Sequence, residues 1–217
     1  MSFALPLFLQ LAASVAPSIA PETLAAFAQA ESRLEPFAIG DNDTGQSYRP
    51  ATAAAAIALA TSLLSQRHSL DLGIMQVNSA NLARVGLTVA TAFDPGQSIR
   101  AGAVILADAY QRCRRNETVE EQAALRCTAS VYNTGKETAG IANGYQARVW
   151  RVAAQLVPAI QIAGNAAPSA PPAPIATQTA PAAAAASPGP VPIRVLSAPT
   201  RPPAWDVYAS AVKSGAK

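Results

Sequence analysis

The sequence contains only one histidine, His68, and only two cysteines among its 217 residues. This scarcity argues against a Ser-His-Asp triad and against a zinc site built from several histidines. A glycine-rich phosphate-binding loop and a dinucleotide-binding fingerprint are also missing from the chain. We therefore expect no metal site and no cofactor, and we expect His68 to be an exposed loop residue.

A strongly basic face is also missing. Residues 1–163 carry 12 basic and 12 acidic side chains, so the net positive charge of the chain lies after this segment. Binding to nucleic acid usually requires clustered lysine and arginine on one face of a domain. The sequence therefore predicts no nucleic-acid partner.

Proline is distributed unevenly, and this divides the chain in two. Eleven of the 18 prolines lie in residues 168–203, in an Ala/Pro/Ser-rich stretch without helical or strand periodicity. Such a stretch cannot bury enough apolar surface to offset its ordering entropy. We predict a folded domain over residues 1–163 and a disordered Pro/Ala-rich tail over residues 164–217, with a short aromatic segment at Trp205 and Tyr208.

The N-terminal segment has no charged side chain before Glu22. Residues 1–20 are either an atypical export signal, since the usual cationic region is missing, or the first helix of the folded domain. Gln10, Ser14 and Pro17 interrupt the apolar stretch, so the sequence predicts no stable transmembrane anchor.

Hydrophobic spacing predicts a mainly helical domain with a small β-hairpin region. One helix begins at Pro21, and another begins at Pro95 behind the N-cap residue Asp94. Further helices are expected over residues 51–64 and 120–131, and a last one from Tyr145 to Pro158. Residues 37–49 form a turn-rich segment, and residues 71–78 are partly extended.

Glu31 ends an apolar stripe that contains Leu24 and Phe27. Burial beside these side chains would raise the pKa of its carboxyl, as a general acid requires at neutral pH. The same periodicity fits a helix-end glutamate that faces solvent. Of the other acidic residues, Glu35 is most simply a solvated helix end, and Asp41, Asp43 and Asp71 are most simply turn formers. If one of these three aspartates faced Glu31 across a groove, hydrolysis with two carboxylates would be favoured instead.

Four short motifs change the balance between these interpretations. Glu31-Ser32, residues 73–76 (Gly-Ile-Met-Gln), residues 132–135 (Tyr-Asn-Thr-Gly) and Tyr145 resemble, in order and spacing, the motifs of soluble lytic transglycosylases. The resemblance covers about residues 5–160 and implies a lysozyme-like α+β fold. Three stretches look like those of the specialised transglycosylases of type IV secretion and conjugation systems. They are residues 20–24 (Ala-Pro-Glu-Thr-Leu), residues 71–78 from Asp71 to Asn78, and the Tyr-Asn-Thr-Gly motif followed by residues 143–145 (Asn-Gly-Tyr).

The resemblance implies that Glu31 is the catalytic acid/base. The enzyme would cleave the glycosidic bond between N-acetylmuramic acid and N-acetylglucosamine and leave a 1,6-anhydro ring. It implies a periplasmic monomer that acts on peptidoglycan beside type IV secretion components. A hydrolytic muramidase and a weakly active peptidoglycan-binding assembly factor are the alternatives. The substrate-binding residues that it implies are Ser32, Ile74, Met75, Gln76, Asn78, Tyr132, Asn133 and Tyr145.

Cys113 and Cys127 lie on successive predicted helices. In an oxidising periplasm they are candidates for a disulfide, which loop-closure entropy would make worth about 3 kcal/mol. The alternative is a pair of small buried thiols.

Overall fold

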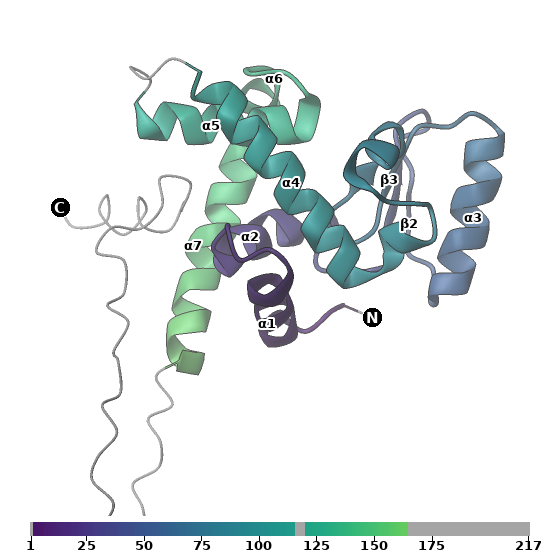
Figure 1. Ribbon diagram of the computed structural model, residues 1–217, viewed down its shortest axis with the longest axis horizontal. Coiled ribbons are helices and arrows are strands. Elements are labelled where there is room, and N and C mark those ends of the chain that lie inside the picture. The colour runs from purple at the N-terminus through teal and green to yellow at the C-terminus, as the bar shows by residue number, and fades with distance from the viewer. Residues whose placement is uncertain (1, 116–119, 165–217) are drawn as a thin grey trace, which may run out of the picture.

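The computed structural model describes residues 2–115 and 120–164 (Figure 1). The predicted tail from residue 165 onwards, with its aromatic segment, lies outside these residues. The helices are α1 (Leu5–Val15), α2 (Pro21–Ser32), α3 (Ala53–Ser65), α4 (Pro95–Cys113), α5 (Glu121–Thr134), α6 (Ala139–Ala142) and α7 (Tyr145–Gly164). The strands are β1 (Ile39–Asp41), β2 (Ser47–Tyr48), β3 (Leu70–Leu72) and β4 (Val77–Asn78). Short 3₁₀ helices span Ser79–Asn81 (η1), Ala83–Val85 (η2) and Thr91–Phe93 (η3). The predicted mainly helical class is confirmed.

The strands form one antiparallel sheet in the order β2-β1-β3-β4. Ile39 pairs with Tyr48 on one side and with Leu72 on the other, and Asp71 pairs with Asn78. The sheet is therefore larger than the predicted hairpin, because β3 returns to β1 after the excursion through α3. Figure 1 shows the sheet and α3 on one side of the domain and the other long helices on the opposite side.

Residues 5–15 form helix α1, which packs in the core of the folded domain. Phe8 and Ala12 lie four residues apart on one face and are completely buried. They pack in the same core as Phe27 of α2 and Leu106 of α4. In the part of the chain that the structure describes, no helix combines the length and the apolar character needed to cross a membrane.

Helix α2 runs through the centre of the helical part. Leu24, Ala25 and Ala28 are completely buried, and one side of the helix packs against α7. The helix ends at Ser32 because Arg33 adopts a left-handed conformation with φ of 61°. Arg49 donates a hydrogen bond from Nη1 to the Ser32 carbonyl at 3.1 Å and so satisfies part of this helix end. Glu31 is thereby held at the last turn of a buried helix.

Helix α7 does not end at Pro158, as the sequence analysis predicted, but continues to Gly164. A proline removes one backbone donor from a helix, and the chain can kink there without leaving the helical conformation. The error concerns only the last turns, because the buried residues Tyr145, Val149 and Ala153 all lie before Pro158.

The structure joins Cys113 at the end of α4 to Cys127 on α5 by a disulfide, with a Cα–Cα distance of 5.9 Å. The two helices also share the most extensive contact between elements of the described chain. Replacing both cysteines with alanine is expected to lower the free energy of unfolding by about 3 kcal/mol, because the bond closes a loop across a separation of 14 residues. Urea denaturation of the wild type and the double variant measures this difference. Reducing agent should destabilise only the wild type, and equal urea midpoints would contradict the prediction.

Candidate active site

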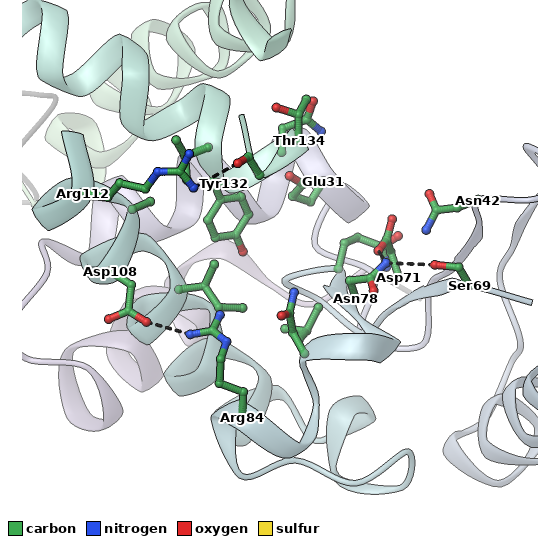
Figure 2. Close-up of a pocket in the computed structure, with 18 residues that line it drawn as sticks. Glu31, Asn42, Ser69, Asp71, Asn78, Arg84, Asp108, Arg112, Tyr132 and Thr134 are labelled. Carbon is green, nitrogen blue, oxygen red and sulfur yellow. Dashed lines mark hydrogen bonds and ion pairs between the residues drawn. The ribbon is translucent and has the colours of Figure 1, made fainter. Parts of the chain in front are cut away.

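Glu31 lies at the meeting point of α2 and α7, and its side chain opens into a groove (Figure 2). The pKa of this carboxyl is raised from 4.5 to about 7, mainly by burial and to a smaller extent by the charge of Asp71, against a hydrogen bond from Tyr145 and the charge of Arg148, which lower it. At neutral pH the carboxyl is therefore divided between its acid and carboxylate forms. A group in this state can both give and accept a proton.

Tyr145 holds the Glu31 carboxyl in place. Its hydroxyl donates to Glu31 Oε1 at 2.5 Å, and the tyrosine itself is completely buried. Asn143 accepts the Tyr145 backbone N–H at 2.9 Å, which fixes the start of α7. Burial raises the pKa of Tyr145 well above its usual value, and the charge of Glu31 adds to this. The phenol therefore stays protonated and remains a donor.

Replacing Tyr145 with phenylalanine is expected to raise the pKa of Glu31 above its value of about 7, because the variant loses a hydrogen bond that favours the carboxylate. Carbon-13 NMR of labelled glutamate carboxyls measures this titration directly. Tyr48→Phe is the matched control, since its hydroxyl bonds the exposed side chain of Gln46. A Glu31 midpoint that stays unchanged or falls would contradict the assigned hydrogen bond.

The turn that joins β3 to β4 forms the floor beneath this site. Gly73 has φ of +77°, and a Cβ there would lie only 2.0 Å from the carbonyl oxygen of Ala92. Gln76 follows with φ of 48°, and its Nε2 donates to the carbonyl oxygens of Gly73 at 2.8 Å and Ala38 at 3.1 Å. Ser98 Oγ accepts the Met75 N–H at 3.3 Å. This network fixes the conformation of the whole turn.

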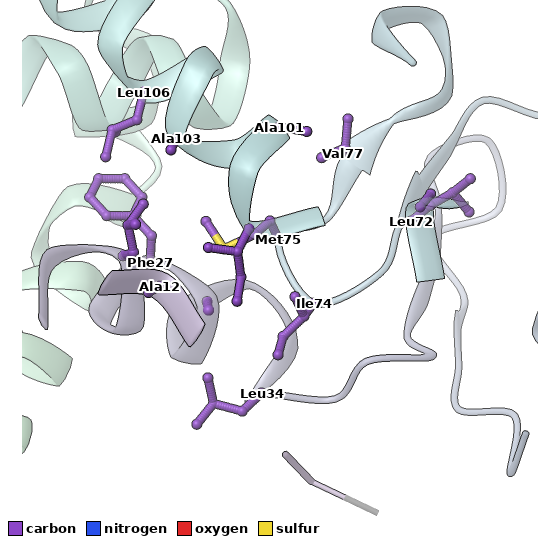
Figure 3. Packing of buried hydrophobic residues seen from close by; sticks show 14 of the residues in the cluster. Ala12, Phe27, Leu34, Leu72, Ile74, Met75, Val77, Ala101, Ala103 and Leu106 are labelled. Atoms are coloured by element: carbon purple, nitrogen blue, oxygen red, sulfur yellow. The ribbon is translucent and has the colours of Figure 1, made fainter. Parts of the chain in front are cut away.

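The structure does not place Ser32, Ile74 and Met75, which were predicted to bind substrate, in the lining of the groove. The hydroxyl of Ser32 is buried and donates to the Ile74 carbonyl at 2.7 Å. Ile74 and Met75 are completely buried, and Figure 3 shows Met75 packed between α2 and α4. Tyr145 is likewise buried and reaches the site only through Glu31. These residues support the groove from behind.

The remaining predicted residues do line the groove, which has a volume of about 540 Å³. They are Glu31, Gln76, Asn78, Tyr132 and Asn133. Tyr132 packs edge-on against Phe27 with ring centroids 5.1 Å apart, and its hydroxyl donates to the Met75 carbonyl at 2.9 Å. The volume lies in the usual range for ligand-binding pockets.

Asp71 is a groove residue that the sequence analysis placed among the turn formers. It lies in β3, lines the groove together with Glu31, and accepts a hydrogen bond from Asn78 Nδ2 at 2.8 Å. Burial raises the pKa of its carboxyl, against the hydrogen bonds from Asn78 and Asn42. The alternation of Leu70, Asp71 and Leu72 is the signal that could have placed this side chain on the open face of a strand.

Asp41 and His68 form a separate pair beyond the groove. Asp41 is buried and caps its own turn by accepting the backbone N–H groups of Asp43 and Thr44, as predicted. His68 was predicted to be exposed but is half-buried, because its Nδ1 lies 2.7 Å from Asp41 Oδ2. Burial alone would raise the pKa of Asp41, but hydrogen bonds from His68, Thr44 and Asp43 outweigh it and lower the pKa to about 2.

Asp43 completes this cluster, and its Oδ2 accepts the Ser69 N–H at 2.6 Å. One ligand atom each of Asp41, Asp43 and His68 lies within 4.8 Å of the others. The carboxylates are already occupied by backbone donors, so the cluster is best understood as a clasp between two loops.

The geometry agrees with a comparison of the whole chain with known families, in which the transglycosylase SLT domain matches residues 8–149. The chain belongs to this family. The match contains α2, the β3–β4 turn, α5 and the first turn of α7, and thus every element that contacts Glu31 or its immediate partners. No solved structure gives a significant match to this SLT domain chain.

Curated relatives narrow the comparison. Protein virB1 of Agrobacterium fabrum (strain C58 / ATCC 33970) is 44% identical over 151 residues, which cover 70% of this SLT domain chain and 61% of the relative. Type IV secretion system protein virB1 of Brucella abortus biovar 1 (strain 9-941) is 41% identical over 133 residues, which cover 61% of this SLT domain chain and 56% of the relative. The SLT domain chain therefore matches only about three fifths of the length of these relatives.

Proposed function

We propose that this SLT domain is a peptidoglycan lytic transglycosylase. The observation that carries the proposal is Glu31, a carboxyl whose pKa is raised to about 7 and which opens into a groove lined by amides and hydroxyls. Such a lining suits the hydroxyl and acetamido groups of sugars. The family match and the order of the groove motifs support the same reaction class.

In the proposed first step, protonated Glu31 gives its proton to the glycosidic oxygen between N-acetylmuramic acid and N-acetylglucosamine. The bond from this oxygen to the muramic acid C1 breaks, and the glucosamine leaves with a new hydroxyl. Glu31 is now a carboxylate and takes the proton of the muramic acid C6 hydroxyl, whose oxygen bonds to C1. The products are a 1,6-anhydro ring and reprotonated Glu31, and no water is consumed.

The position of Asp71 favours a second candidate, a hydrolytic muramidase. Asp71 lines the same groove as Glu31, and its negative charge contributes to the raised pKa of Glu31. In a transglycosylase this carboxylate would stabilise the positive charge that develops on the sugar ring. In a hydrolase it would act as the nucleophile or activate water. Both reactions use Glu31 as the acid.

Digestion of purified sacculi in ¹⁸O-labelled water separates these candidates, with mass spectrometry of the released fragments as the measurement. A transglycosylase gives 1,6-anhydro ends without label, because the attacking oxygen comes from the sugar. A hydrolase gives reducing ends that carry one ¹⁸O. Binding to sacculi without either product would support the weakly active assembly factor instead.

We further propose that cleavage opens the wall locally for a type IV secretion or conjugation machine in the periplasm. The relatives named virB1 from Agrobacterium and Brucella support this context. Complementation of a donor strain that lacks its own copy of this gene tests it. Wild-type protein should restore transfer and Glu31→Gln should not, whereas equal restoration by both would remove the need for wall cleavage.

A further inference from the structure

The two ends of the groove differ in chemistry. Figure 2 shows Asp71, Asn42, Ser69 and Asn78 together at the sheet end. At the other end, the guanidinium groups of Arg84 and Arg112 line the groove beside Tyr132. Both arginines come from elements outside the motifs of the sequence analysis, namely η2 and α4.

Arg84 retains most of its hydrogen-bonding capacity. Within the described chain it donates one hydrogen bond, from Nη1 to Asp108 Oδ2 at 2.8 Å. A guanidinium has five N–H donors, so the edge formed by Nε and Nη2 remains open. This edge has the geometry that binds a carboxylate through two parallel hydrogen bonds.

Arg112 lies one turn beyond Asp108 on α4 and is held by the segment that follows α5. Its Nη1 donates to the Gly135 carbonyl at 3.1 Å, and its Nε approaches Glu137 Oε1 at 3.4 Å. The ion pairs of both arginines are exposed: 49% and 61% of the Arg84 and Asp108 side chains are accessible, and 40% and 57% of the Arg112 and Glu137 side chains. Exposed pairs of this kind contribute little to stability, so these guanidiniums can bind another anion at small expense.

The sugar rings of peptidoglycan offer no partner for these charges, because N-acetylated sugars are neutral. The muramic acid, however, carries a stem peptide on its lactyl group, and this peptide bears free carboxylates. We propose that Arg84 and Arg112 bind stem-peptide carboxylates and so select peptide-bearing strands over uncharged ones. This proposal rests on the proposed cleavage of peptidoglycan and adds a specificity determinant to the groove.

Two soluble substrates that differ only in charge test this selection. One is uncrosslinked peptide-bearing glycan, and the other is the same glycan after carbodiimide-coupled amidation of its carboxylates. The wild type is expected to show a KM about 10-fold lower for the charged substrate, with a similar kcat for both. In Arg84→Gln/Arg112→Gln this difference should disappear, and rising salt should reduce it in the wild type.

Three variants and a third substrate separate recognition of the carboxylate from a purely structural role of the arginines. Arg100→Gln, an exposed arginine of α4 outside the groove, should keep the wild-type preference, and Arg84→Lys should keep only part of it. If Arg84 merely clamps η2 to α4, the double variant will melt earlier and lose affinity for both substrates equally, which overturns the proposal. Amidase-stripped strands, which keep a lactyl carboxylate, would overturn it by binding as tightly as peptide-bearing strands.

Equilibrium binding in the Glu31→Gln background supplies a readout that does not need turnover. Tighter binding of charged than of amidated strands supports the arginine site even if the wild type releases no fragments. Failure of cleavage alone therefore counts against the proposed function, and equal binding of the two substrates counts against the arginine site.

Discussion

Glu31→Gln is expected to reduce cleavage of peptidoglycan by roughly 10²- to 10⁴-fold, the usual contribution of a general acid/base. Glutamine keeps the size of the side chain and can accept the hydrogen bond of Tyr145, but it cannot give a proton to a glycosidic oxygen. The release of soluble fragments from labelled sacculi measures the loss. Glu22→Gln, the same change at the other end of α2, should retain full activity.

The same variant is expected to be more stable than the wild type above neutral pH. The pKa of Glu31 is raised in the folded state from 4.5 to about 7, so ionisation at high pH disfavours folding. The contribution of protonated Glu31 to the free energy of unfolding is complete below pH 4.5, declines as the pH rises and is lost above pH 7. The total effect is about 3 kcal/mol. Glutamine has no such dependence.

Thermal unfolding at pH 5 and pH 8 tests this sign. The wild type should lose more stability than Glu31→Gln between these two conditions, while Glu22→Gln should follow the wild type. A variant that loses activity and also melts earlier at pH 8 would contradict the assigned burial of Glu31. Loss of activity together with a gain of stability at pH 8 is expected if Glu31 is a catalytic carboxyl whose burial destabilises its charged form.

Gly73→Ala is expected to destabilise the protein by about 3–5 kcal/mol. The added methyl group would lie 2.0 Å from the backbone carbonyl of Ala92 and 3.0 Å from Ser98 Oγ, in a left-handed conformation that alanine disfavours. Because the contact is with backbone, it cannot be relieved by rotating a side chain. The β3–β4 turn must shift, and with it Gln76 on the groove floor.

Gly86→Ala separates the steric clash from the conformational strain. Gly86 has φ of +72°, close to that of Gly73, but a Cβ at this position would have no neighbouring atom within 4 Å. Its replacement should cost about 1 kcal/mol, which corresponds to the left-handed conformation alone. Urea denaturation of the two variants gives the comparison, and equal losses would show that the Ala92 contact is unimportant.

Local sequence signals predicted the helices well, because their information is contained in neighbouring residues. Asp94 accepts the Gln97 N–H at 2.8 Å as an N-cap, and Pro95 occupies the first turn of α4. The spacing of Glu31 from Leu24 and Phe27 left two interpretations open, and the resemblance of the four motifs to lytic transglycosylases favoured the catalytic one. The helix end after Ser32 was harder, since it depends on the left-handed Arg33 and on Arg49 from a distant loop.

The groove itself could not be derived from short motifs, because a motif does not tell which of its side chains face outward. Ile74 and Met75 lie between two groove-lining positions, Asp71 and Gln76, yet both are completely buried. Gly102 of α4 makes the close packing of Met75 possible, since a Cβ there would lie 2.7 Å from Met75 Cε. Arg84 and Arg112 have no local signal at all, and only tertiary packing places both of them along the groove.

The hydrogen bond from Tyr145 to Glu31 joins residues that are 114 positions apart in the chain. Contacts of such long range form late in folding, because the loop-closure entropy must be offset by other contacts first. During synthesis, a growing chain that has not reached α7 contains Glu31 but neither the phenol nor the helix face that covers α2. We therefore expect Glu31 to acquire its buried environment, and with it competence for cleavage, only in a chain that contains α7.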